Sequence, residues 1–362
     1  MNRRDFLQAA GLIACISSSS RTARGQHSVT PGWRTFELTT RIEIVKPSGT
    51  THIWVPEPLI SQAPFQRTGP TTWQGSGGIV KKSQNTRDAL DMLVARFPPG
   101  VQPVLTVTSR ASTRTWSADL SVPEHSQRLT PAERDYFLRA TTQLPTDGIV
   151  RQKATAITKN AGTDLQKARA IYEWIVENTY RNPKTRGCGT GDIRFMLESG
   201  DLGGKCADLN ALYVGLARAA GLPARDVYGI RAAPSQLGFK SLGVSSENVT
   251  KAQHCRAEVY LDDCGWVPVD PADVRKVMLE EPPHPRPLDD ETVTRARKRL
   301  FGSWEMNWIA FNFGHDVSLP GSAGPPLHFL MYPQAETADG RLDCLNPETF
   351  RYEIQCREVS TV

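Results

Sequence analysis

Residues 203–213 read Gly-Gly-Lys-Cys-Ala-Asp-Leu-Asn-Ala-Leu-Tyr, and this stretch decides how the rest of the chain is interpreted. An apolar stripe at helical spacing predicts a buried helix, formed by Leu209, Leu212, Tyr213 and Leu216. Gly221 and the proline that follows it soon after end this helix. Cys206 therefore lies in the first helical turn, just after a glycine bend. The unpaired backbone N–H groups of that turn favour a thiolate.

Two predicted strands downstream carry the residues that a cysteine nucleophile needs. His254 opens an apolar run that ends at Leu261, and residues 266–271 return after a turn as Trp-Val-Pro-Val-Asp-Pro. An antiparallel pair of this kind can bring His254 and Asp270 together. An imidazole activates the thiol, and a carboxylate on its other ring nitrogen orients it. The three residue types predict nucleophilic catalysis, with the Cys206 backbone N–H facing the developing oxyanion.

A single buried cysteine or histidine is usually part of the core. The prediction of a catalytic site therefore rests on the combination of Cys206, His254 and Asp270. A zinc site is the competing interpretation. No C-x-x-C or H-x-x-H spacing is present, and the glycine pairs do not make a phosphate loop. We expect neither a metal nor a cofactor.

The pattern resembles the transglutaminase-like superfamily over roughly residues 165–275. The resemblance rests on the order and spacing of Gly-Lys-Cys-Ala-Asp at 204–208, Gly-Leu-Pro-Ala-Arg at 221–225, His254, and Gly-Trp-Val-Pro-Val-Asp-Pro at 265–271. It implies a papain-like α+β core with Cys206 as nucleophile, His254 as general base and acid, and Asp270 as orienting carboxylate. It also implies acyl transfer through a thioester.

The chain departs from the family pattern in places. Family members often have His-Ala-Trp where this chain has His254 followed by Cys255 and Arg256, which changes one wall of the site. A polar insertion at 234–251 precedes His254, and loops of this length are commonly functional; we expect a lid or a substrate wall. Tyr180 is the candidate for the second oxyanion donor; the alternative is an aromatic residue that only packs on the preceding helix.

The chain of 362 residues divides into four expected parts. Residues 1–25 form a leader, and residues 26–125 alternate apolar and polar residues between turns, which predicts a sandwich-like antiparallel β domain. Residues 126–282 form the catalytic domain, and residues 283–362 a β-rich C-terminal extension that packs on the core. Helix-start signals occur at Thr130, Asp147, Thr163 and Asp192.

The leader indicates export. Arg3 and Arg4, followed by Asp-Phe-Leu and a short apolar stretch, resemble a twin-arginine signal peptide with cleavage after Gly25. In the alternative interpretation, a lipobox ends at Cys15, which is lipidated. Either route predicts a periplasmic or secreted protein. Six cysteines remain in the body. A disulfide involving Cys188 is open, and free thiols are favoured.

Composition excludes several classes of protein. Hydrophobic residues make up 39% and charged residues 22%, as in ordinary globular proteins. The net charge of +5 becomes near-neutral without the four arginines and one aspartate of the leader, so we expect no nucleic-acid binding. No apolar run is long enough to span a membrane.

Three functions fit these features. The first is a cysteine peptidase or amidase that acts on a peptide or protein amide. The second is a cross-linking transglutaminase, and the third a non-catalytic binding or assembly module on the same scaffold. The oligomeric state stays open.

Overall fold

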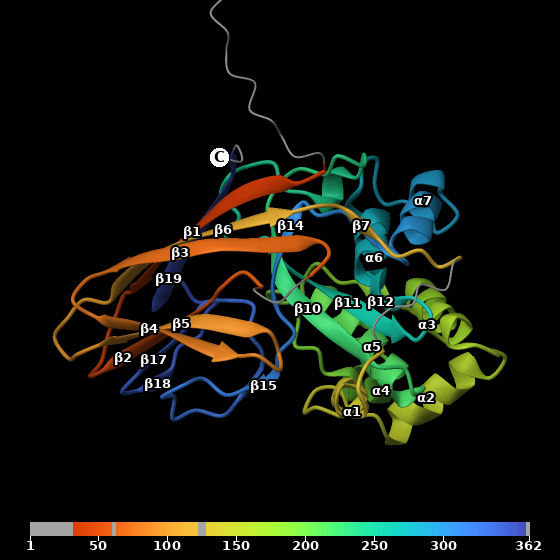
Figure 1. Ribbon diagram of the computed structural model, residues 1–362, viewed down its shortest axis with the longest axis horizontal. Helices are drawn as coiled ribbons and strands as arrows, with labels where there is room; N and C mark the ends of the chain where they lie inside the picture. Colours follow the sequence, from red (N-terminus) through yellow and green to blue (C-terminus); the bar gives the residue numbers. More distant parts are fainter. Residues whose placement is uncertain (1–31, 60–62, 122–127, 360–362) are drawn as a thin grey trace, which may run out of the picture.

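The computed structural model describes residues 32–59, 63–121 and 128–359. The expected leader, including Cys15, lies outside the described residues. Figure 1 shows two parts side by side, a β-sandwich and a mixed part that holds the helices around a smaller sheet. The expected α+β class is confirmed.

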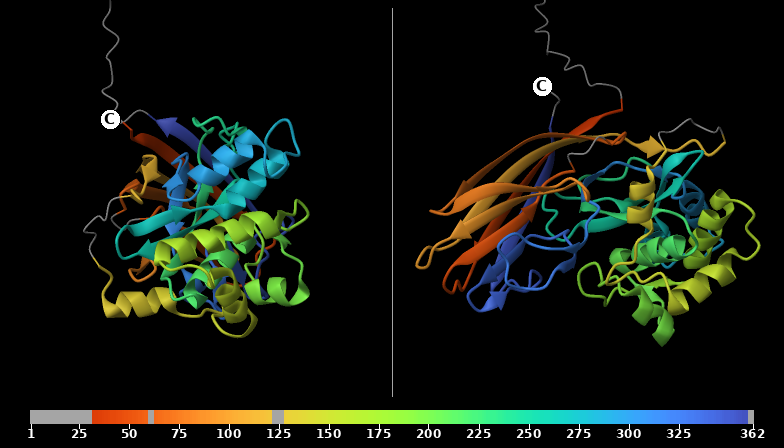
Figure 2. Two further views of the ribbon diagram at one scale, coloured as in Figure 1. Left: turned by 90° about the vertical axis from the view of Figure 1, so that its right-hand side faces the viewer. Right: turned by 60° about the horizontal axis from the view of Figure 1, so that its bottom comes forward.

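Two antiparallel sheets form the sandwich. The first has the strand order β19 (Phe350–Val359), β1 (Arg34–Ile44), β6 (Val104–Thr113) and β3 (Gln66–Gly75). The second has the order β18 (Gly340–Arg341), β17 (Gln334–Thr337), β2 (Thr51–Pro56), β5 (Leu90–Phe97) and β4 (Ile79–Asn85). The sandwich therefore combines strands from both ends of the chain, and Figure 2 shows the red and blue strands together in this part.

The inner face of β1 shows why the alternation predicts a half-buried strand. Residues 36, 38, 40, 42 and 44 are buried and their neighbours are partly or fully exposed. Ile42 and Ile44 pack between the two sheets of the sandwich. Phe36 and Leu38, which lie nearer the start of β1 on the same face, pack instead on the mixed part that holds the helices. One strand thus contributes to two cores.

The mixed part, which holds the sequence-predicted site residues and is called the catalytic part for that expectation, is built on a third antiparallel sheet, with the strand order β12 (Gly265–Val269), β11 (Gln253–Leu261), β10 (Ala224–Arg231) and β14 (Trp308–Asn312). Around it lie the helices α1 (Pro131–Leu138), α2 (Gly148–Thr158), α3 (Asp164–Asn178), α4 (Ile193–Ser199), α5 (Cys206–Ala219), α6 (Pro271–Glu280) and α7 (Glu291–Arg299). Within the described part of the chain, none of the helices is long and apolar enough to cross a membrane.

The helix starts follow the local sequence signals. Thr130 and Thr163 each form a reciprocal capping box, and the Asp192 carboxylate accepts from the backbone N–H of Phe195. These predicted helix starts are confirmed. Helix α5 is buried along its whole length, because α2, α3 and the sheet cover it. Its start therefore has a fixed place at the edge of the sheet.

The C-terminal region, expected as a β-rich extension that packs on the core, is divided between the two parts of the molecule. Helix α7 packs into the core of the catalytic part, and β14 joins the catalytic sheet. Strand β17 pairs with β2, and β19 pairs with β1 over ten residues. These pairings join residues hundreds of positions apart, so no local pattern in the sequence points to them.

An apolar cluster joins the first sheet of the sandwich to the catalytic sheet. It contains Phe36 and Leu38 of β1, Ile354 of β19, Ile230 of β10 and Phe311 of β14, among others. The cluster fixes the sandwich against strands β10 and β14, and so positions the part of β19 that borders the catalytic pocket described below.

We predict that Ile354→Ala lowers the free energy of unfolding by about 2–5 kcal/mol, because Ile354 is 3% exposed and its loss leaves a cavity in this cluster. The control is Arg351→Ala on the exposed face of β19, for which we expect a change within about 0.5 kcal/mol. Urea denaturation of both variants measures the difference. Equal small effects would contradict the cluster's role.

Candidate active site

Cys206 is the first residue of α5, and the loop before it is held in place by Asp208. The Asp208 carboxylate accepts backbone N–H groups from Lys205, Thr190 and Gly191 at 2.9, 2.9 and 3.0 Å. Gly189 has φ +99°, and a Cβ there would lie 1.9 Å from an Asp208 oxygen. A glycine is therefore required at this close approach. The loop of residues 187–191 is thereby tied to the helix start.

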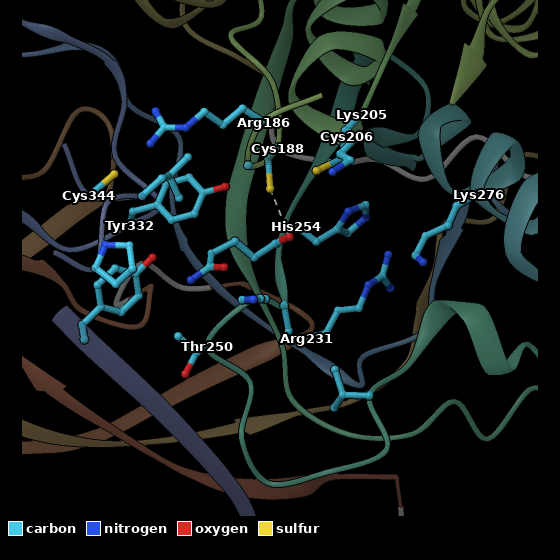
Figure 3. A pocket seen from close by; sticks show the side chains of 18 of the residues that line it. Arg186, Cys188, Lys205, Cys206, Arg231, Thr250, His254, Lys276, Tyr332 and Cys344 are labelled. Atoms are coloured by element: carbon cyan, nitrogen blue, oxygen red, sulfur yellow. Dashed lines mark hydrogen bonds between the residues drawn. The ribbon is translucent and has the colours of Figure 1, made fainter. Parts of the chain in front are cut away.

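His254 and Asp270 come together at the end of the neighbouring strands. The His254 Nε2 atom lies 2.8 Å from Asp270 Oδ2, and both side chains are buried. Asp270 follows β12 and also caps α6, where its Oδ1 accepts the Asp273 backbone N–H at 3.1 Å. Since Asp270 binds Nε2 of the His254 ring, Nδ1 is the nitrogen that can bind a thiol. Figure 3 shows the Cys206 sulfur close to the His254 ring.

A second carboxylate and two guanidinium groups complete the buried cluster around His254. Asp273 Oδ2 lies 3.4 Å from His254 Nε2, and Arg231 binds Asp273 at 2.5 Å. Arg256 Nε lies 3.6 Å from Asp270 Oδ2. The Arg256 guanidinium also lies 4.7 Å from the ring centre of Trp308. The residue that replaces the family's tryptophan thus serves as a counter-ion to Asp270.

Neutral side chains bind the other carboxylate oxygen of Asp270 and the backbone around His254. Asn210, one helical turn after Cys206, donates to Asp270 Oδ1 at 3.2 Å and to the Cys255 carbonyl at 2.9 Å. Trp308 Nε1 donates to the His254 carbonyl at 2.9 Å. Helix α5, strand β11 and strand β14 are therefore connected through this site.

The electrostatics favour charge on both His254 and Cys206. Burial and Arg231 lower the pKa of His254, but Asp273 and Asp270 outweigh them and raise it to about 10. Hydrogen bonds from Cys188, Cys255 and His254 hold the pKa of Cys206 well below its usual range, against the opposing effect of burial. Near neutral pH the arrangement therefore favours a thiolate–imidazolium pair.

The two carboxylates respond differently to burial. Burial and the charge of Asp273 raise the pKa of Asp270, although His254 and Arg256 oppose this. Burial also disfavours the charge on Asp273, but Arg231 and His254 hold its pKa well below the usual range. Asp273 is thus the carboxylate most firmly fixed in its ionised form.

Cys188 lies beside Cys206, although it is distant from it along the chain. Its sulfur lies 3.2 Å from the Gln253 carbonyl oxygen, drawn as a dashed line in Figure 3, and its single S–H donates either to that oxygen or to the Cys206 sulfur. Burial and the contact with Cys206 leave the pKa of Cys188 well above its usual range, so it stays a neutral donor. All six cysteines of the described residues are free thiols, as we expected in preference to a disulfide.

The structure does not bring Tyr180 into this group. Tyr180 lies in β8 (Tyr180–Arg181), is 45% exposed and donates its hydroxyl to Asp201 at 2.8 Å. It packs over Gly203 of β9 (Gly203–Gly204), outside the lining of the pocket described next. The side chain serves the strand pair that leads to Cys206.

Cys206, His254 and Cys188 open into a pocket of about 550 Å³. The polar insertion supplies part of its wall, through Gly243, Val244, Thr250 and Lys251. The insertion is anchored on the sandwich, since Val249 donates its N–H to the Ile354 carbonyl at 2.8 Å. Its position agrees with the expected substrate wall. A further part of the wall comes from residues 344–352, which the sequence did not connect with the site.

His254, Asp270 and Asp273 are close enough together to hold a metal ion. Both carboxylates already face guanidinium groups, however, and Arg231 forms a buried pair with Asp273. A cation at this point would be repelled by Arg231 and Arg256. The donor set therefore fits a network of ion pairs better than a metal centre.

Sequence reasoning missed Arg231, Asn210 and Asp273. The signals for two of them are local, since Asn210 lies one helical turn after Cys206 and Asp273 lies in the turn that follows Asp270. Arg231 has no such signal, because it reaches Asp273 from a different strand.

Comparisons with known proteins agree with this geometry. A family model described as "Transglutaminase-like superfamily" matches residues 151–271, which include all three residues Cys206, His254 and Asp270. An uncharacterized protein of Haemophilus influenzae is 32% identical over 96% of this chain and 98% of its own length.

Two solved structures are similar. The first is a presumed cysteine protease from Cytophaga hutchinsonii, with a TM-score of 0.55 and 15% identity over 91% of this chain and 92% of that chain. The second is the periplasmic domain of TgpA from Pseudomonas aeruginosa, with a TM-score of 0.34 and 18% identity over 67% of this chain and 88% of that one. The first likeness concerns the fold alone. Residues 151–271, which hold Cys206, His254 and Asp270, therefore form a domain of the transglutaminase-like superfamily.

Proposed function

We propose that the protein is an exported cysteine hydrolase that cleaves an amide or peptide bond through a thioester on Cys206. The observation that carries the proposal is the 2.8 Å contact between His254 Nε2 and Asp270, buried beside a thiol at the start of a helix. Export rests on the leader pattern of the sequence, which predicts a periplasmic or secreted location.

In the acylation step, the Cys206 thiolate attacks the carbonyl carbon of the substrate amide. The Cys206 backbone N–H has no acceptor within the helix and is available to the developing oxyanion. The His254 imidazolium transfers its proton to the leaving amine, the C–N bond breaks, and a thioester remains. Asp270 stays in contact with Nε2 throughout, which holds the ring in orientation.

In the deacylation step, neutral His254 takes a proton from water, and the resulting hydroxide attacks the thioester. The carbon–sulfur bond breaks, the carboxylic acid leaves, and the thiolate–imidazolium pair is restored. Each residue thus returns to its starting protonation state.

The cross-linking alternative replaces this water by an amine. Lysine side chains approach as ammonium ions, and the pocket already contains several arginine and lysine side chains. Like charges lower the local concentration of such an acceptor. The charge of the pocket therefore favours hydrolysis over amine transfer. A non-catalytic module has no need of a buried imidazolium with two carboxylate partners.

We predict that the purified protein cleaves members of a peptide or amide library and that Cys206→Ala abolishes cleavage. Asp270→Asn removes the charge of the carboxylate but keeps the helix cap, because an asparagine can still cap α6. We expect it to lower kcat by about 10³–10⁴-fold, and to lower thermal stability as well, because it removes the buried counter-ion of Arg256. Product release is followed by mass spectrometry. Incorporation of a labelled amine in place of hydrolysis would favour the transglutaminase, and inactivity of the wild type on all substrates would favour the binding module.

The pH dependence of alkylation tests the thiolate–imidazolium pair. The pair exists above the lowered pKa of Cys206 and disappears as the pH rises through the His254 pKa of about 10. We therefore expect a nearly constant iodoacetamide rate at Cys206 between about pH 6 and about pH 8, where an ordinary thiol gains reactivity steeply. In His254→Gln the profile should shift towards that of an ordinary thiol, while the donors Cys188 and Cys255 remain. A wild-type profile that already looks ordinary would contradict the pair.

The neighbouring thiol Cys188 provides a further test. In Cys188→Ala the donor to Cys206 is lost, so the pKa of Cys206 should rise and alkylation at about pH 6 should slow by about three- to tenfold. The matched variant Cys188→Ser keeps a donor and should remain closer to the wild type. Equal rates in both variants would show that Cys188 only fills space.

A further inference from the structure

The charged side chains that line the pocket beside Cys206 are all cationic. Six cationic side chains border it, and no aspartate or glutamate does: Arg181, Arg186, Lys205, Arg231, Lys251 and Lys276. This asymmetry is unusual for a chain whose body is near-neutral. Whether it acts on a ligand depends on how many of these charges are already balanced from behind the pocket wall.

Two of the six cations have a carboxylate of their own. Arg231 is paired with Asp273 at 2.5 Å, in the cluster behind His254. Arg186 is paired with Asp343 at 2.5 Å, and both of these side chains are well exposed. These two cations contribute little net charge to the pocket.

The other four cations have a single carboxylate among them, and only two of the four bind it. Arg181 and Lys276 both bind Glu280, which lies outside the lining. In the described part of the chain, no carboxylate lies within ion-pair distance (4.0 Å) of Lys205 or Lys251. The pocket therefore has an excess of positive charge at Lys205, which directly precedes Cys206, and at Lys251, three residues before His254.

A further feature points to a ligand that supplies acceptor oxygens. The Gln253 Nε2 donor is buried in the pocket lining without a partner among the described residues. Buried donors are normally satisfied, and a carboxylate or carbonyl oxygen of a ligand would satisfy this one.

The other side of the pocket is apolar and aromatic. It is formed by Tyr332, Leu345, Pro347, Phe350 and Tyr352. In Figure 3, Tyr332 and Lys276 lie on opposite sides of His254. An extended ligand that crosses the catalytic pair would therefore have one end near aromatic rings and the other near cations.

We propose that the substrates are acidic peptides in which a glutamate or aspartate lies beside the scissile amide, with an apolar residue on the other side of the bond. This proposal rests on the proposed hydrolase function for the site. It adds to it the recognition of a carboxylate by Lys205 and Lys251 and of an apolar side chain by the aromatic wall.

The test measures peptide binding without requiring turnover. N-acetylated pentapeptide amides that differ only in one glutamate, glutamine or lysine, placed before or after an Ala-Phe-Ala centre, are used to protect Cys206 from iodoacetamide. We expect the glutamate peptide to protect at about three- to tenfold lower concentration than the glutamine peptide, with the lysine peptide weakest. The preference should shrink in about 0.5 M salt.

The variant Lys205→Gln/Lys251→Gln should lose most of the preference for glutamate. The matched control Lys46→Gln/Lys159→Gln removes two exposed lysines that do not line the pocket and should keep the preference. Equal protection by the three peptides, stronger protection by the lysine peptide, or no protection by any of them would overturn the proposal.

Cleavage of the same peptides, followed in parallel, separates the two proposals. Protection by the glutamate peptide without cleavage of any substrate would contradict the hydrolase while leaving the charge preference intact. Cleavage of all three peptides at equal rates, with equal protection, would contradict only the preference for acidic substrates.

Discussion

The contact between His254 and Asp270 is possible only because the surrounding chain balances the charges that it buries. Five ionisable side chains, each at most 4% exposed, lie together there: Arg231, His254, Arg256, Asp270 and Asp273. Each buried charge costs several kcal/mol of desolvation unless ion pairs and hydrogen bonds offset it. Several connections of the fold bring the ion-pair and hydrogen-bond partners of these side chains into place.

The region after the catalytic motif illustrates this requirement. Arg256 donates to the Glu305 carbonyl at 2.9 Å and lies over Trp308, and Trp308 in turn binds the His254 carbonyl. Arg231 donates to the Leu242 carbonyl at 2.6 Å, which comes from the insertion. Without Glu305 and the insertion, these two buried guanidinium groups would each lose a backbone carbonyl acceptor. The chain on both sides of the motif is therefore part of the catalytic unit, and the same insertion forms a wall of the pocket.

What the sequence predicted well depends on interactions close along the chain. The capping boxes at Thr130 and Thr163, and the position of Cys206 at a helix start, follow from residues within one turn of each other. Strands β3 and β4 were missed because they are mostly polar and exposed, so they lack an apolar alternation. The ion pairs of Arg231 and Arg256, like the pairing of β19 with β1, join distant segments, and nothing local indicates them.

The protonation of the site follows from the same balance. Asp270 and Asp273 have two guanidinium partners, Arg256 and Arg231, so these four groups are neutral together. A protonated His254 adds one positive charge, and the Cys206 thiolate adds one negative charge. The buried cluster is therefore neutral both as a thiol with neutral imidazole and as the ion pair, so a proton moves from sulfur to ring without changing the net charge. The position of that proton is then decided by local contacts, and the carboxylates on one side of the ring and the thiol donors around the sulfur both favour the ion pair.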